Sequence, residues 1–303
     1  MTPILKKIVL GLGAFAVVAT TGVAYAAGGK SDYKMKHPHW HFDGARGTYD
    51  RAAVQRGFQV YREVCAACHA LDYLSFRHLG DKGGPYYDKA YKNPNDNPHV
   101  KAFAAEYDIK TIDSETGDEI DSDTGGYITR SGVPADKFPP IFANEAAARA
   151  SNGGALPPDL SLIVAARGGG ADYIYNLLTA YGLEVPADVS LGAGQHYNPV
   201  MDGSAIAMAA PLSDGQVEYA AITYNDNDGN EIVVPAPAAT VDQMAKDVTE
   251  FLAWTSDPKM EQRKSLGFAV MIYLLILSVL LYFCYKAVWR NVEHELKLCL
   301  TEK

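Results

Sequence analysis

The sequence contains few cysteines. There are 4 in 303 residues, and only Cys65 and Cys68 lie close together in the sequence. A structural zinc site built on such a pair needs four ligands, whereas Cys284 and Cys299 lie far downstream, one in an apolar run and one in a charged tail. No second Cys-x-x-Cys pair is therefore present to complete a tetrahedral zinc site.

The sequence also lacks an excess of basic residues. With 27 Lys and Arg against 36 Asp and Glu, the formal net charge is −9. We therefore expect no nucleic-acid partner, because nucleic-acid binding needs clustered positive charge. We detect no internal repeat, and the pattern does not favour a β-sandwich.

The cysteine pair belongs to the segment YREVCAACHALDY at residues 61–73. Upstream, Asp50 can cap a helix, and apolar residues then recur at helical spacing, which predicts one buried helical face carrying both thiols. These residues are Val54, Phe58, Tyr61, Cys65 and Cys68. Two thiols one turn apart, followed directly by His69, suit two thioether bonds to haem and an imidazole ligand on its iron. A redox-active thiol pair is the alternative, although it leaves His69 without a role.

Both ends of the chain carry apolar segments. Residues 1–26, with Lys6 and Lys7 before an apolar run and a small-x-small site at Ala24 to Ala26, are typical of a cleaved signal peptide, with an uncleaved anchor as the alternative. Residues 266–285 contain no charge. A helix of that length rises about 30 Å, enough to cross a bilayer. We expect an exported domain at 27–265, a transmembrane helix at 266–288 and a cytoplasmic tail at 289–303.

The exported part is rich in loops, with most of the chain's 27 Gly and 16 Pro, and it contains two polar stretches. The segment at residues 105–132 is strongly acidic, so it is either a solvated loop or a surface that attracts a basic partner. Asn227, Asp228 and Gly229 give a turn signal between apolar runs. His37, His39 and His41 alternate near the N-terminus, a pattern that favours a docking loop over a metal site because no carboxylate or cysteine clusters with them.

The sixth position of a haem iron separates an electron carrier from an oxygen-handling enzyme. Among several methionines and histidines, Met208 stands out because small residues surround it in SAIAMAAPL, which would let the backbone approach a flat macrocycle. The other candidates are Met201, Met244, Met260, His78, His99 and His196.

Four segments together resemble the cytochrome c1 family of proteobacterial type, the membrane-anchored haem subunits of cytochrome bc1 complexes (ubiquinol–cytochrome c reductases). They are RGFQVYREVCAACHALDYLSFRHL, EAAARASNGGALPPDLSLIVAARGGGADYIYNLLTAY, HYNPVMDGSAIAMAAPL and MAKDVTEFLAWTSDP, followed by the single C-terminal span. The resemblance implies a mainly α fold: a class I c-type cytochrome-like haem domain with loop insertions, plus one C-terminal transmembrane helix.

The resemblance also implies roles for individual residues. Cys65 and Cys68 match the thioether cysteines, His69 matches the proximal iron ligand and Met208 the distal one. Arg167 matches an arginine near a haem propionate, and the alternative is that it pairs with a surface carboxylate. The matching pocket residues are Asn152, Ala155, Pro157 and Tyr173. Some bacterial members have an additional disulfide in the haem domain, which this chain cannot form, so we expect packing alone to hold its methionine loop.

The implied function is a one-electron relay in the respiratory or photosynthetic chain, coupled to proton translocation. The chain would carry one covalent haem c. It would take electrons from the Rieske iron–sulfur subunit and pass them to a soluble or tethered cytochrome c. Its other contacts would be the cytochrome b subunit and membrane lipid, within a dimer of complexes. By itself it would be no enzyme. The haem domain would lie on the periplasmic side of the bacterial inner membrane. Asp118, Glu119, Asp121 and Asp123 are candidates for docking the acceptor. A haem subunit of a terminal oxidase and a peroxidase-like enzyme are the rival interpretations.

Overall fold

The centre of the globular domain is formed by two helices that come from opposite ends of its sequence. The computed structural model describes residues 33–114, 116–122, 124–225 and 229–301, with side chains up to residue 290. Helix α2 (Arg51–Glu63) begins at Asp50, whose carboxylate accepts hydrogen bonds from the N–H groups of Ala52 and Ala53, as the sequence predicted. Helix α7 (Val241–Ser256) begins at Thr240, whose hydroxyl accepts from the N–H of Gln243.

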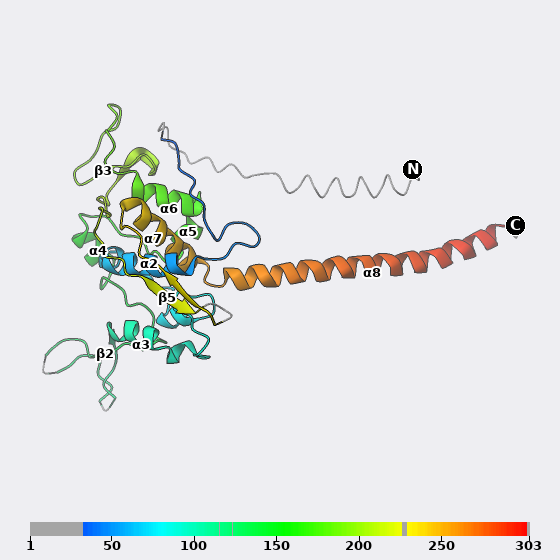
Figure 1. Ribbon diagram of the computed structural model, residues 1–303, viewed down its shortest axis with the longest axis horizontal. Coiled ribbons are helices and arrows are strands. Elements are labelled where there is room, and N and C mark those ends of the chain that lie inside the picture. Colours follow the sequence, from blue (N-terminus) through cyan, green and yellow to red (C-terminus); the bar gives the residue numbers. More distant parts are fainter. Residues whose placement is uncertain (1–32, 115, 123, 226–228, 302–303) are drawn as a thin grey trace.

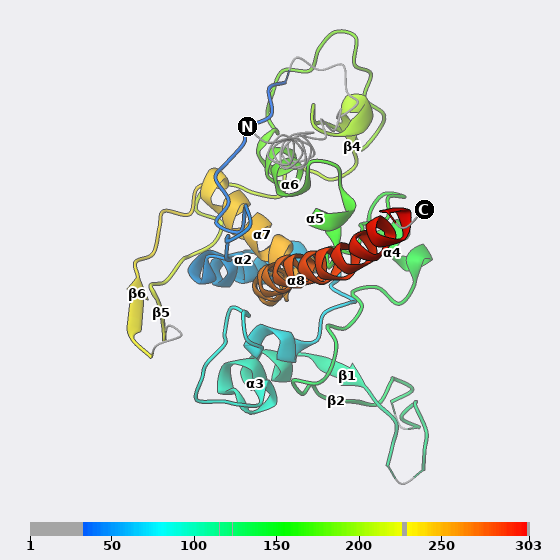
Figure 2. The same ribbon diagram turned by 90° about the vertical axis from the view of Figure 1, so that its right-hand side faces the viewer.

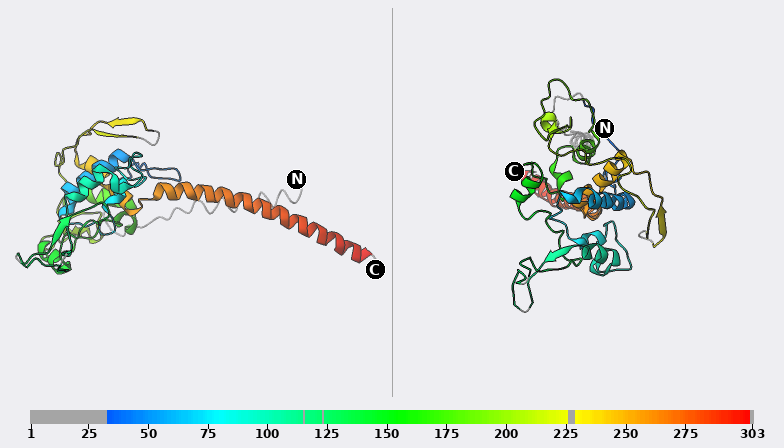
Figure 3. Two further views of the ribbon diagram at one scale, coloured as in Figure 1. Left: turned by 90° about the horizontal axis from the view of Figure 1, so that it is seen from below. Right: turned by 90° about the vertical axis from the view of Figure 1, so that its left-hand side faces the viewer.

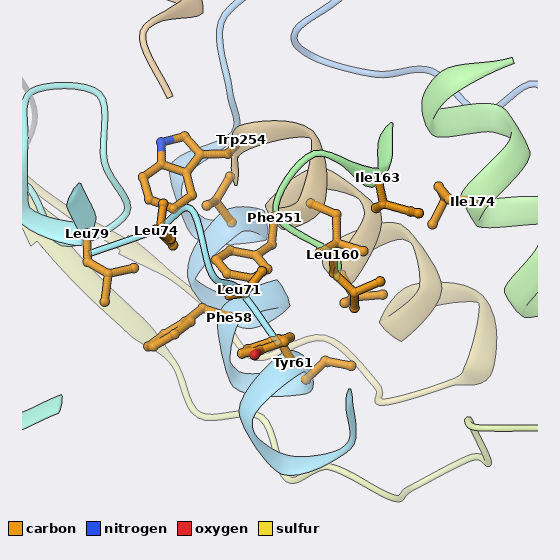
Figure 4. Close-up of a cluster of buried hydrophobic side chains, with 14 of the residues drawn as sticks. Phe58, Tyr61, Leu71, Leu74, Leu79, Leu160, Ile163, Ile174, Phe251 and Trp254 are labelled. Carbon is orange, nitrogen blue, oxygen red and sulfur yellow. The ribbon is translucent and has the colours of Figure 1, made fainter. Parts of the chain in front are cut away.

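Helices α2 and α7 cross at Gly57, where their backbones come very close. A Cβ atom at this position would lie 2.0 Å from the carbonyl oxygen of Asp247 and 2.7 Å from the Cβ of Phe251, so only glycine allows this approach. Around the crossing, the ring of Phe251 lies 5.5 Å from that of Phe58 and 5.7 Å from that of Tyr61. Figure 4 shows these three rings close together at the crossing, and the Phe251 ring is tilted against the other two. The crossing anchors the hydrophobic core.

Charged groups are buried beside this crossing. Arg56 donates two hydrogen bonds to Asp247, of 2.9 and 2.8 Å, which satisfies a guanidinium and a carboxylate that solvent scarcely reaches. One turn further along α7, Glu250 is 2% exposed and accepts a hydrogen bond of 3.1 Å from the backbone N–H of Asp50. Burial, with the nearby carboxylates adding to it, raises the pKa of Glu250 to about 7.

The remaining elements of the domain are short. The helices are α3 (Pro98–Ala105), α4 (Glu145–Ser151), α5 (Ile163–Ala166) and α6 (Gly170–Thr179), with 3-10 turns at Cys65–Ala67, Phe76–Gly80, Pro94–Asp96 and Asp202–Ser204. The strands form three antiparallel pairs: β1 (Asp108–Lys110) with β2 (Thr129–Ser131), β3 (His196–Tyr197) with β4 (Ala205–Ile206), and β5 (Ile222–Asn225) with β6 (Glu231–Val234). The prediction of a mainly α, loop-rich domain is confirmed.

Both polar stretches form hairpins. Strands β1 and β2 carry the acidic segment away from the domain (Figure 1). Strands β5 and β6 project from the domain as a second hairpin (Figure 3). This second hairpin agrees with the predicted turn between apolar runs, although Asn227 and Asp228 lie outside the described residues. The acidic segment contains a short repeat, DSETG at 113–117 and DSDTG at 121–125. The expectation of no internal repeat was therefore wrong for this segment. In each copy the aspartate side chain caps the turn, Asp113 accepting from Thr116 N–H and Asp121 from Thr124 N–H.

A single long helix leaves the domain. Helix α8 (Met260–Thr301) extends far beyond the other elements (Figures 1 and 3), and its segment Met260–Arg290 is long and apolar enough to cross a membrane, with none of its most apolar stretch buried against the domain. This C-terminal transmembrane helix was predicted, and the expected span at 266–288 falls within it. The expected signal peptide at 1–26 lies outside the described residues.

Candidate functional site

The Cys-x-x-Cys-His segment directly follows α2. The α-helix ends at Glu63, and Cys65–Ala67 continue as a 3-10 turn. The N–H groups of Cys68 and His69 both donate to the carbonyl oxygen of Cys65, over 3.1 and 2.9 Å. This turn brings the two thiols and the imidazole together over five residues.

The two thiols differ in their surroundings. Cys65 packs against the core, and burial raises its pKa to about 12, so the thiol stays neutral. Cys68 is exposed. The prediction that one continuous helix buries both thiols was wrong for Cys68, because the tighter 3-10 turn rotates it away from the face that α2 buries. One thiol therefore packs against the core and the other faces solvent.

His69 is held from two sides. Its Nδ1 lies 2.8 Å from the carbonyl oxygen of Pro158, and its own carbonyl oxygen accepts a hydrogen bond of 2.9 Å from the hydroxyl of Tyr61. A carbonyl oxygen only accepts, so Nδ1 carries the proton and Nε2 presents a lone pair. Burial also lowers the pKa of His69, which favours the neutral imidazole that binds metals.

The segment that contains Pro158 runs alongside the motif. Leu160 N–H donates to the carbonyl oxygen of Ala70 over 3.0 Å, Asp72 N–H donates to the carboxylate of Asp159 over 2.8 Å, and Tyr73 N–H donates to the hydroxyl of Ser161 over 3.2 Å. These bonds fix the carbonyl oxygen of Pro158 against the imidazole. The expected pocket residues Asn152, Ala155 and Pro157 lead into this segment and are half-buried.

The four candidate methionines differ in how their side chains are buried and bonded. Met244 is fully buried in the core and Met260 is 5% exposed, so neither sulfur is open to a ligand. The sulfur of Met201 already accepts a hydrogen bond of 3.6 Å from the hydroxyl of Tyr173. Met208 is half-buried, and among the described residues its sulfur accepts no hydrogen bond, although its carbonyl oxygen does. The geometry therefore favours Met208 over the other three.

The loop that carries Met208 is fixed to α6 and to the residues after it. Tyr181 donates to the carbonyl oxygen of Met208 over 3.0 Å. Asn198, which is completely buried, donates from its side chain to the carbonyl oxygen of Leu177 over 2.8 Å. The expectation that packing alone holds this loop was wrong, since two part-buried hydrogen bonds also hold it.

The structure places the other candidates as follows. Arg167 ends α5 and is exposed, and in the described part of the chain it forms no ion pair with a carboxylate. Burial raises the pKa of Tyr173, and the positive charge of Arg167 opposes that shift. Among the described residues no hydrogen bond joins His69 to Met208, and their binding to one iron stays a prediction.

The alternating histidines have a structural role at one position. Nδ1 of His37 lies 2.7 Å from Asp172 on α6, and the indole of Trp40 donates to the same carboxylate over 2.7 Å. Sequence reasoning missed Asp172, because only the fold brings it to these residues. Among the described residues, no group of three or more His, Cys, Asp or Glu side chains is placed to hold a metal ion.

The motif lies at the end of the domain that is remote from α8. The start of α2 contacts the start of α8, since Tyr49 N–H donates to Glu261 over 3.0 Å. Helix α2 contains 13 residues and therefore extends about 20 Å before the motif begins. The acidic hairpin lies on this remote side as well (Figure 1). Asp118 and Glu119 are exposed and Asp121 is half-buried, whereas Asp123 lies outside the described residues.

The comparisons with known proteins agree on one family. The model of the cytochrome C1 family matches residues 40–292. The chain is 36% identical to "Cytochrome c1" of Rhodospirillum rubrum over 310 residues, 97% of this chain and 100% of that protein. It is 42% identical to "Cytochrome c1, heme protein, mitochondrial" of Saccharomyces cerevisiae over 254 residues, 84% of this chain and 72% of that protein. It is 44% identical to "Cytochrome b/c1" of Bradyrhizobium diazoefficiens over 270 residues, 83% of this chain but only 35% of that longer protein.

Proposed function

Because the chain belongs to the cytochrome c1 family, we propose that it relays single electrons from a Rieske iron–sulfur subunit to a c-type cytochrome. It is a haem subunit of the cytochrome bc1 complex, works in electron transfer, and carries a covalently bound haem c. Our proposal adds the donor, the acceptor, the contact with the cytochrome b subunit and the assembly as a dimer of complexes.

The observation that carries the proposal is the orientation of His69 beside the two thiols. We assign Cys65 and Cys68 as the thioether positions, with Cys65 on the core side and Cys68 on the solvent side. The hydrogen bond from Nδ1 to Pro158 leaves Nε2 available as the proximal ligand. Bound haem supplies one-electron chemistry through the ferric and ferrous states of its iron.

In this proposal the sulfur of Met208 would hold the haem iron together with the imidazole of His69. A thioether donor is soft and favours the ferrous state, and two protein ligands leave no open position for oxygen or substrate. Tyr181 fixes the backbone of Met208, which limits rearrangement when the charge of the site changes. We propose that Arg167, which is exposed and forms no ion pair with a carboxylate among the described residues, supplies the positive charge for a haem propionate. The chain therefore transfers electrons without making or breaking substrate bonds and is no enzyme by itself.

The placement of the site suits exchange with partners outside the bilayer. The motif begins about 20 Å along α2 from the end that contacts α8, so a donor domain or a water-soluble cytochrome can reach it. We place this domain on the periplasmic side of a bacterial inner membrane, with α8 as its single span.

Affinity purification through a tag on this chain tests the proposal. We expect a cytochrome b subunit and a Rieske subunit to copurify, and quinol to reduce the haem in that complex. Copurification with terminal oxidase subunits and no Rieske protein would identify a different membrane relay. Ready binding of carbon monoxide by the reduced protein would show an open sixth position.

A further inference from the structure

A basic pocket lies where the domain meets α8. It has a volume of about 450 Å³ and is formed by one continuous stretch of chain that includes Lys82, Lys89 and Lys92. Tyr87 and Tyr91 also line it, and Asp81 is its only acidic lining residue. Three ammonium groups against one carboxylate make it positive in a chain whose net charge is −9. The volume falls within the range of small-ligand pockets.

The pocket is fixed directly to the start of the membrane helix. Gln262 on α8 donates to the carbonyl oxygen of Lys82 over 3.1 Å. Trp254, at the end of α7, donates to the carbonyl oxygen of Gly83 over 3.0 Å. Leu266, where the uncharged run begins, follows Gln262 by four residues, a rise of about 6 Å. The Lys82 end of the pocket therefore lies about one helical turn outside the uncharged run.

A second loop also contacts the start of α8. The ammonium of Lys264 donates to the carbonyl oxygens of Phe42 and Gly47, and the guanidinium of Arg46 lies 5.9 Å from the ring centre of Phe268. Lys and Arg side chains near the end of a transmembrane helix commonly lie at the membrane interface. Figure 2, which looks along α8 toward the domain, shows this loop and the segment between α2 and α3 on either side of the helix.

The lysines of the pocket are available for a ligand. In the part of the chain that the structure describes, none of the three forms an ion pair with a carboxylate, and all three are exposed. The cations of α8 beside them are already engaged, because Arg263 pairs with Asp257 and Lys264 binds backbone carbonyls. The pocket therefore has free positive charge beside the start of α8.

The frame of the pocket is rigid. Gly84 N–H donates to the carbonyl oxygen of Asp81 over 2.7 Å, the buried amide of Asn97 donates to the carbonyl oxygen of Tyr86 over 2.7 Å, and Arg51 donates to that of Pro85 over 2.9 Å. A rigid frame reduces the entropy lost when a ligand binds. We propose that the pocket binds the headgroup of an anionic phospholipid, with Lys82, Lys89 and Lys92 around the phosphate and Tyr87 and Tyr91 at the lipid–water boundary.

Lipid counting on the full-length chain tests this. Nanodiscs of phosphatidylcholine with phosphatidylglycerol would be used, and native mass spectrometry would count the phosphatidylglycerol that stays on the chain after release. We expect the wild type to retain it. The triple variant K82Q/K89Q/K92Q should lose affinity about 30- to 100-fold, since each lysine near an anionic lipid surface contributes appreciably to binding. The triple arginine variant at the same positions should retain the lipid, which separates charge from folding.

The control variant K34Q/K110Q/K246Q removes the same charge outside the pocket and should bind like the wild type. Equal retention by the pocket variant and the wild type would overturn the proposal. Displacement of the bound lipid by inorganic phosphate would also overturn it, because the pocket would then be a site for the free ion. The haem absorption per chain, measured in every variant, should stay constant.

Discussion

The imidazole Nδ1 of His69 donates a hydrogen bond of 2.8 Å to the carbonyl oxygen of Pro158. The bond joins the haem-binding motif to a segment 89 residues further along the chain. It settles the tautomer, because the acceptor has no proton to give. It also means that the motif and the segment at 157–161 must fold together before Nε2 points in a fixed direction. The ligand is oriented by tertiary structure and not by the motif alone.

Replacing Met208 with Leu should lower the midpoint potential of the haem by a large part of the roughly 0.8 V that axial ligation can set. Leucine conserves volume and removes the sulfur, so the ferrous state loses its soft ligand. Met201→Leu is the matched control, because that sulfur accepts a hydrogen bond from Tyr173. Redox titration of both variants checks this. A collapse of the potential in Met201→Leu with no change in Met208→Leu would reverse the assignment.

Glu250 should make the stability of the domain depend on pH. Its pKa is raised by burial from 4.5 to about 7 in the folded chain, so between these values the folded state binds more protons than the unfolded state. The free energy of unfolding should therefore fall as pH rises through this window and level off above it. Glu250→Gln should flatten the dependence and stabilise the protein at pH 8 by up to about 3 kcal/mol. Thermal unfolding at pH 5 and pH 8 measures both effects; an unchanged difference between the two pH values in the variant would contradict this account.

Ending the chain after Ser265 should release the haem domain from the membrane. The apolar run that begins at Leu266 is removed, whereas the hydrogen bonds of Lys264 to Phe42 and Gly47 remain within the domain. We expect a water-soluble protein with an unchanged haem spectrum, measured after fractionation and a salt wash. Retention on the membrane would mean that residues 1–26 stay attached as a second anchor.

Neutralising the acidic hairpin should slow electron transfer to a basic cytochrome at low salt. Asp118 and Glu119 are exposed and Asp121 half-buried, so together with Asp123 they can raise the encounter rate through long-range attraction. Steering should fade as the Debye length falls from about 30 Å at 0.01 M salt to about 10 Å at 0.1 M. Changing the four residues to Asn or Gln should flatten this salt dependence without changing the potential. If stopped-flow rates and salt slopes match those of the wild type, the hairpin is only a solvated loop.

Local sequence patterns predicted the elements that depend on local interactions. The cap at Asp50, the apolar stripe of α2 and the uncharged run of α8 all lie where the residues indicated, since capping and apolar spacing act over a few neighbouring positions. The pattern did not show that α2 would stop at Glu63, after which the chain continues as a 3-10 turn whose Cys68 and His69 N–H groups share the carbonyl oxygen of Cys65.

Contacts between distant segments could not be predicted in this way. The tether of His37 and Trp40 to Asp172 joins residues more than a hundred positions apart, and Asn198 offers no local signal that its amide reaches α6. The pocket at Lys82 depends on Gln262, which is equally remote in sequence. Such partners follow from the packing of the helices, which composition and spacing do not determine.

The pyridine haemochrome spectrum of the purified chain tests the central claim most directly, because it reports the number of thioether bonds to the haem. We predict two thioether bonds in the wild type and one in either Cys65→Ala or Cys68→Ala. The double variant should have no covalent haem, with the haem-stained band lost from a denaturing gel. Full-strength covalent haem in the double variant, or no haem absorption in the wild type, would contradict the account.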